Sequence, residues 1–134
     1  MSKVTTILLA ASVSVLCVPA FAEGSDEGQA LYEQFCTACH GTMAKGAGEI
    51  AELLTLVPPD LTKLSASNDG EFPMLGVIHT IDGRTGVRAH GGPMPIYGAI
   101  FSAESAAKGS GYGSVLETRG RILSLALYLE SIQQ

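Results

Sequence analysis

Hydrophobic residues recur at the spacing of an α-helix in four stretches of this chain. The last stretch shows this pattern most clearly. The positions that follow this spacing up to the C-terminus are Val115, Leu116, Arg119, Ile122, Leu123, Ala126, Leu127 and Ile132. Ser114 and Glu117 stand at the separation of a capping box, in which each side chain accepts a hydrogen bond from a backbone N–H near the helix start. The pattern predicts a C-terminal helix capped by Ser114.

Three helices are expected before it. They are a helix that starts at Ser25 or Asp26 and continues into residues 36–40, a short helix over residues 49–55, and a helix from about Pro73 to Asp82. The side chain of Ser25 or Asp26 would cap the first, and Gly83 follows the third at a position where glycine commonly ends a helix.

The remaining residues have the composition of loops. No stretch alternates in the manner of a strand over a useful length. All 16 glycines lie beyond residue 22, at about twice the usual frequency of roughly 7%. Residues 103–113 are rich in Ala, Ser and Gly and are expected to form a surface loop. The pattern predicts an all-α domain with long loops.

The first 22 residues have the pattern of a secretory leader. Lys3 supplies the positive start, residues 7–18 form an apolar run broken only by two serines, and residues 20–22 fit a signal-peptidase site. A retained membrane anchor is the alternative, but a span needs about 20 consecutive apolar residues. We expect cleavage after Ala22, export to the periplasm, and a mature domain of residues 23–134 without stable membrane insertion.

The leader also accounts for much of the apolar content. The chain is 46% hydrophobic over 134 residues, and 15 of its apolar residues lie in the leader. Without Lys3, 7 Lys and Arg face 13 Asp and Glu, a net charge of −6. Such an acidic domain is a poor ligand for nucleic acid or anionic membranes, and it favours a protein partner with a basic docking surface.

Two cysteines remain once the leader and its Cys17 are removed. Cys36-Thr37-Ala38-Cys39-His40 matches the attachment motif of c-type haem, in which each sulfur adds across a porphyrin vinyl group and the histidine ligates iron. In a helix, positions i, i+3 and i+4 share one face, so both sulfurs and the imidazole would reach the same ring. The motif predicts one covalent haem c.

The cysteine pair also fits a disulfide, a redox Cys-x-x-Cys site or half of a zinc site. A zinc site needs further ligands, but residues 23–134 contain no other cysteine, and His79 and His90 are distant in sequence. A thioredoxin-like site would need a preceding strand and a following βαβ pattern, and neither is present. The histidine directly after Cys39 favours haem.

The second axial ligand decides whether the iron binds small molecules or only transfers electrons. Met43 is too close to His40 to reach the opposite face of the ring, and Met74 lies on the apolar face of an expected helix, where a core position is favoured. Met94 lies in a Gly- and Pro-rich loop, residues 90–98, outside any expected helix. We predict Met94 as the second ligand.

Other side chains of this region are weaker candidates. His79 is expected to be a partly buried helix residue, and His90 a loop residue near the haem edge. Arg84 and Arg88, in the loop that leads to His90, either remain solvated or pair with haem propionates through charge-assisted hydrogen bonds.

Taken together, these motifs resemble those of a known family. Residues 36–41, the Met94-Pro95-x-Tyr97-Gly98 loop and a C-terminal helix bearing Leu125 and Tyr128 together are similar to a bacterial monohaem class I cytochrome c. The resemblance covers residues 25–132. It implies a fold of three to five helices, with crossing N- and C-terminal helices and long loops wrapped around one covalent haem.

The resemblance also implies how the two terminal helices meet. Gly28 and Tyr32 on the first helix would contact Leu125 and Tyr128 on the last. Gly28 would then be a position of close approach, which explains a glycine inside a helix.

By the same resemblance, three residues contact the haem or its ligand. The Pro59 carbonyl accepts the Nδ1 hydrogen of His40, which fixes the tautomer that presents Nε2 to iron, and Leu61 packs on the ring. Tyr97 stands where many relatives carry tryptophan, in a chain without any Trp, and is expected near a propionate.

Two functions follow from these expectations. One is a diffusible periplasmic electron carrier with a low-spin haem, reduced by a respiratory complex or dehydrogenase and reoxidised by an oxidase or reductase. The other is a cytochrome c subunit of a periplasmic oxidoreductase complex, with the same ligands. A ligand-binding or peroxidatic haem requires that Met94 does not bind iron. No acid–base constellation indicates that the chain is an enzyme by itself.

Overall fold

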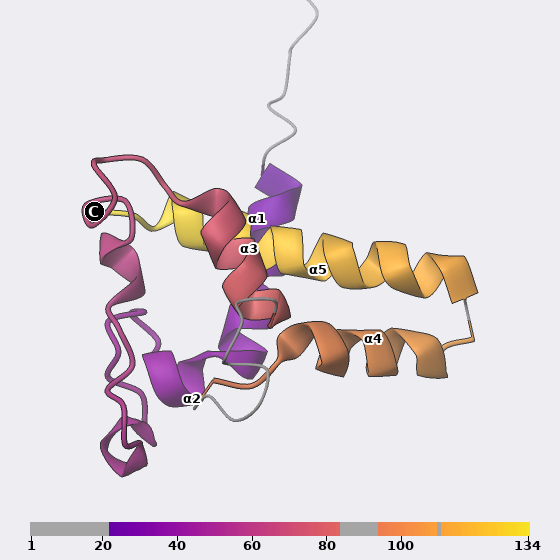
Figure 1. Ribbon diagram of the computed structural model, residues 1–134, viewed down its shortest axis with the longest axis horizontal. Coiled ribbons are helices and arrows are strands. Elements are labelled where there is room, and N and C mark those ends of the chain that lie inside the picture. The colour runs from indigo at the N-terminus through magenta and orange to yellow at the C-terminus, as the bar shows by residue number, and fades with distance from the viewer. Residues whose placement is uncertain (1–21, 84–93, 110) are drawn as a thin grey trace, which may run out of the picture.

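The computed structural model describes residues 22–83, 94–109 and 111–134 (Figure 1). These residues contain five α-helices, two short 3-10 turns and no strand. The elements are α1 (Ala22–Phe35), α2 (Thr37–His40), the turns Ala51–Leu53 and Leu61–Lys63, α3 (Met74–Asp82), α4 (Tyr97–Ala107) and α5 (Gly111–Ser131). The predicted all-α fold is confirmed.

The first and last helices cross, as predicted (Figure 1). A Cβ atom on Gly28 would lie 2.0 Å from the carbonyl oxygen of Ser124, so only glycine permits this approach of the two backbones. Beside the crossing, the rings of Tyr32 and Tyr128 lie 5.3 Å apart, and Leu125 is fully buried. The terminal helices therefore form the centre of the core.

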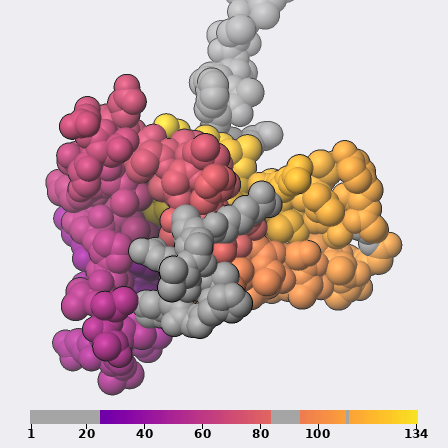
Figure 2. Space-filling model, in the orientation of Figure 1, coloured from indigo at the N-terminus to yellow at the C-terminus, as the bar shows by residue number. Residues whose placement is uncertain are grey.

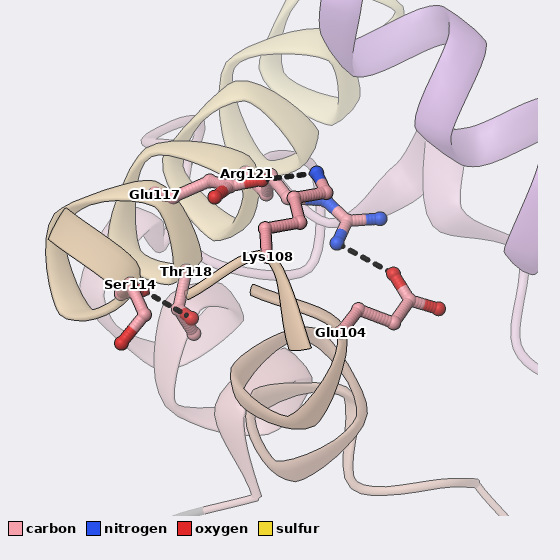
Figure 3. A network of polar contacts seen from close by, with 6 residues as sticks. All are labelled: Glu104, Lys108, Ser114, Glu117, Thr118 and Arg121. Carbon is pink, nitrogen blue, oxygen red and sulfur yellow. Dashed lines mark hydrogen bonds and ion pairs between the residues drawn. The ribbon is translucent and has the colours of Figure 1, made fainter. Parts of the chain in front are cut away.

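Helices α4 and α5 form an antiparallel pair that projects to one side of the molecule (Figures 1 and 2). Phe101 and Ser105 are fully buried on α4. Two ion pairs also join the helices, Lys108 with Glu117 and Arg121 with Glu104, each at 2.7 Å (Figure 3). The start of α4 lies next to the end of α1, since the Tyr97 hydroxyl donates to the carbonyl of Phe35.

The loop predicted over residues 103–113 is wrong. Helix α4 continues to Ala107, and α5 begins at Gly111. Alanine has the highest helix propensity, and the buried face of α4 gives the alanine-rich segment a surface to pack on.

The predicted capping box is also wrong, because α5 begins three residues before Ser114. The Ser114 hydroxyl donates to the carbonyl of Gly111 at 2.8 Å, inside the helix. Glu117 accepts instead from Lys108, at the end of α4.

Two other helix ends differ from the prediction. Helix α1 begins at Ala22, so Ser25 and Asp26 lie inside it rather than at its cap. The helix expected over residues 49–55 is a single 3-10 turn. The backbone at the start of this turn is hydrogen-bonded to α2 instead, since the N–H of Ile50 donates to the Ala38 carbonyl at 3.0 Å.

The third predicted helix is confirmed as α3, and Gly83 ends it in a left-handed conformation with φ of 86°. The predicted leader lies outside the described residues except for Ala22. Within the described ranges, no helix combines the length and apolar character needed to span a bilayer.

Candidate functional site

Residues 36–40 continue from α1 as a second short helix. The N–H of Cys36 donates to the carbonyl of Tyr32, and the N–H of His40 donates to that of Cys36, both at 2.9 Å. This segment is helical, as the motif requires. The geometry places the side chains of Cys36, Cys39 and His40 on one face.

The two thiols of this helix are free and half-buried. Burial raises the pKa of the Cys36 thiol to about 12, and the neighbouring Cys39 thiol adds to the shift. A redox-active Cys-x-x-Cys pair needs the opposite, a thiol whose pKa is lowered. Cys36 therefore has the environment of a neutral thiol rather than of a nucleophilic thiolate.

The imidazole of His40 is buried in the same region. Burial lowers its pKa, and hydrogen bonding toward the Pro59 backbone partly opposes that effect. Its Nδ1 atom is buried and, by the usual limits on distance and angle, it makes no hydrogen bond to a described residue. A neutral imidazole is the form that ligates a metal, and a proton on Nδ1 leaves Nε2 available. Pro59 is the acceptor expected at this position.

Glycines hold the loop after the motif close to α2. A Cβ atom on Gly48 would lie 2.2 Å from the carbonyl oxygen of Ala38, and one on Gly46 would lie 2.1 Å from that of Pro58. Gly46 also has a positive φ of 78°. The loop consequently brings residues 58–59 beside the motif helix.

Leu61 is held on both sides of its peptide unit. Its N–H donates to Ala44 at 2.7 Å, and its carbonyl accepts from Gln133 Nε2 at 2.8 Å. The carboxylate of Asp60 accepts from the N–H and the hydroxyl of Thr62, and these hydrogen bonds lower the pKa of Asp60. Leu61 itself is partly buried against the core.

Met94 lies outside any helix, as predicted, and packs partly buried against the core. Two glycines bring the end of α3 close to this segment. A Cβ atom on Gly83 would lie 2.4 Å from Cγ2 of Ile96, and one on Gly98 would lie 2.0 Å from a carboxylate oxygen of Asp82. These approaches explain the glycine that ends the Met94–Gly98 motif.

Tyr97 joins residues 94–98, called the methionine segment below, to the end of α1 just before the haem-attachment motif. Its hydroxyl donates to the carbonyl of Phe35 at 2.6 Å, directly before Cys36. Burial raises the pKa of Tyr97 to about 12, with smaller contributions from the two motif thiols, so the phenol keeps its proton at neutral pH. The hydroxyl hydrogen is thus committed to a backbone carbonyl.

The two residues joined by this bond also belong to an aromatic cluster that no sequence motif indicates. The ring of Phe35 lies 6.0 Å from that of Tyr97 and 5.2 Å from that of Phe101, between ring centroids. Arg121 covers Phe101, with its Cζ atom 3.9 Å from the ring centroid. No local pattern connects these residues, because they are distant in sequence.

The other residues considered from sequence have no comparable position. Met43 is 69% exposed, Met74 packs against the core as predicted, and His79 is half-buried on α3 as predicted. The predictions for Arg84, Arg88 and His90 lie outside the described residues.

Comparison with known proteins bears on the whole arrangement. A family model described as Cytochrome c matches residues 25–108, more than half of the chain. No curated protein and no solved structure matches the chain. The family binds haem c covalently and uses it for electron transfer, and Cys36, Cys39 and His40 have the spacing of its attachment motif. The chain therefore belongs to the cytochrome c family.

Proposed function

We propose that this protein is a periplasmic electron carrier with one low-spin haem c. Cys36 and Cys39 form the thioethers, and His40 and Met94 are the axial ligands. The observation that carries the proposal is the pairing of two free thiols with a buried imidazole whose Nδ1 lacks a complete hydrogen bond. Those groups fit a haem, because it consumes both thiols and fixes the imidazole by its other nitrogen.

On the histidine side, the chain supplies a fixed tautomer. With haem bound, the Pro59 carbonyl would accept the Nδ1 proton of His40 and leave Nε2 for the iron. Leu61 would pack on the haem, and its backbone is held by Ala44 and Gln133. A hydrogen bond to Pro59 would limit the movement of the imidazole between oxidation states.

On the other side, the chain supplies a thioether from a restrained segment. Met94 is followed by a proline and is packed against the core, while α3 and α1 hold residues 96–98. A bound haem c supplies the Fe(III)/Fe(II) couple, and histidine with methionine ligation raises its potential. A closed coordination sphere favours electron transfer over ligand binding.

The location and partners follow from sequence. The leader pattern of residues 1–22 supports export and cleavage after Ala22. The net charge of −6 for residues 23–134 supports docking of donor and acceptor proteins through basic surfaces, in the small contacts typical of transient electron transfer.

The test is an absorption spectrum of the wild type and of Met94→Ala in both oxidation states. We expect low-spin spectra and an iron–thioether band that is lost in the variant. A high-spin wild type that readily binds carbon monoxide would contradict ligation by Met94. Release of haem from acid-denatured protein would contradict the thioethers at Cys36 and Cys39.

One observation favours the second function, a cytochrome c subunit of an oxidoreductase complex. Helix α5 exposes Tyr112, Leu116 and Leu123 at 79%, 53% and 45%, with a spacing that places them on one face. Exposed apolar faces of this kind mark protein contacts. Purification of the native protein decides between the two functions, because a carrier elutes alone and a subunit elutes with its complex. If the protein is a subunit, the substitutions L116E and L123E should release it from the complex.

A further inference from the structure

We propose that Tyr97 is a positioning residue, whose hydrogen bond to the Phe35 carbonyl holds Met94 on the iron. This inference rests on the proposed ligation by Met94. The bond is 2.6 Å long, and the Tyr97 side chain is buried, at 8% exposure. It joins the two halves of the site directly, because Phe35 precedes Cys36 and Tyr97 follows Met94 by three residues.

The connection from Tyr97 to Met94 is short and stiff. Pro95 has its φ fixed by its ring, and Ile96 is extended, with φ of −87° and ψ of 91°. Tyr97 is the first residue of α4, so its backbone is set by the helix. A movement of Met94 away from the iron is therefore transmitted to the phenol.

The acceptor end is equally restrained. Phe35 is the last residue of α1, and its ring makes edge contacts with Tyr97 and Phe101. Arg121 closes the cluster from α5, with its Cζ atom 5.6 Å from the centroid of the Phe35 ring. The packing of Phe35 thus restrains the carbonyl to which the phenol hydroxyl donates.

The other contacts of the segment lead elsewhere. Gly98 approaches Asp82, and Ile96 approaches Gly83, both at the end of α3. These contacts fix the segment against α3, whereas the bond of Tyr97 sets its position relative to the helix that carries the thioethers. Loss of that bond should release the methionine before it loosens the fold.

The test is Tyr97→Phe, which keeps the ring and its aromatic contacts and removes only the donor. Tyr32→Phe is the matched control, because Tyr32 is also buried and its hydroxyl also donates to a backbone carbonyl at 2.6 Å, that of Gly41. Both variants lose one buried hydrogen bond, but only Tyr97 is attached to the methionine segment.

The measurement is the titration of the ferric, haem-loaded proteins with imidazole, followed by the loss of the iron–thioether band. Removal of one buried hydrogen bond predicts an imidazole affinity about five- to tenfold higher in Tyr97→Phe than in the wild type. Tyr32→Phe should retain the wild-type affinity. Equal affinities in Tyr97→Phe and the wild type, or equal increases in both variants, would overturn the inference.

A second measurement separates positioning from general stability. Each ferric protein is heated while the thioether band and the helical circular dichroism are recorded. Only in Tyr97→Phe should the band disappear at a lower temperature than the circular dichroism signal. Coincident transitions in that variant would contradict the proposal. A wild type without the band contradicts the ligation by Met94 instead, so the two failures are distinguishable.

Discussion

The guanidinium of Arg121 lies over the ring of Phe101, with 3.9 Å between Cζ and the ring centroid, and donates to Glu104 at 2.7 Å. The Arg121 side chain is only 15% exposed. The pair of Lys108 and Glu117 joins the same two helices at 2.7 Å, but its lysine is 66% exposed. The two ion pairs thus have equal length, but their cations differ strongly in exposure to solvent.

We predict that Arg121→Met lowers the free energy of unfolding by about 1–2 kcal/mol, because it removes a shielded cation–π contact and a charge-assisted hydrogen bond. Lys108→Met should change stability little, since solvent screens an exposed pair. Urea unfolding of the haem-loaded proteins measures both effects. Equal losses in the two variants would show that burial does not distinguish the pairs.

Gly28 and Gly120 provide the second prediction. Gly28→Ala places a Cβ atom where Ser124 leaves no room, so we expect a loss of about 1–3 kcal/mol or more. Gly120 lies inside α5, and a Cβ atom added there would point into open space, so Gly120→Ala should gain up to about 1 kcal/mol from helix propensity. Thermal unfolding tests both signs, and stabilisation by Gly28→Ala would contradict the crossing.

The local patterns predicted the parts of the fold that depend on neighbours in sequence. Spacing three and four residues apart was sufficient for α3 and for the helical motif at Cys36, and the Gly and Pro residues around Met94 predicted a methionine outside any helix. Each of these features depends on backbone preferences within a few residues.

The errors have tertiary causes. Residues 103–107 have the composition of a loop, but they are helical because α5 covers the face of α4 that carries Phe101 and Ser105. The position of Arg121 over Phe101 likewise depends on the pairing of two helices. No local pattern contains that information, because packing overrides weak propensities.

The side chain of Gln133 connects the C-terminus to the loop that carries Leu61. Its Nε2 donates to Leu61 and Leu129, and its Oε1 accepts from the N–H of Ser65. Gln133→Ala leaves these backbone groups without their partner, so we expect a loss of about 2–3 kcal/mol. Gln134→Ala is the control, because the hydrogen bond of Gln134 to Thr62 comes from its backbone. Similar unfolding midpoints in urea for the two variants would contradict this role.

The carboxylate of Asp60 provides a prediction on pH. Hydrogen bonds from Thr62 lower its pKa from the ordinary value of 3.8, so the folded state binds this proton less readily than the unfolded state. The resulting stability is present above the unfolded pKa and is lost as the pH falls through the folded pKa. Asp60→Asn can accept the same hydrogen bonds without titrating.

The stability of the wild type relative to Asp60→Asn should therefore decrease as the pH falls below about 4. Urea unfolding of both haem-loaded proteins at a series of pH values measures this difference. Effects of acid on the haem ligands and on the other carboxylates, including Glu117, occur in both proteins and cancel in the comparison. A constant difference from neutral pH to about pH 2.5 would mean that the Asp60 carboxylate has the same pKa in the folded and unfolded chains. The hydrogen bonds from Thr62 would then not depend on the charge of residue 60.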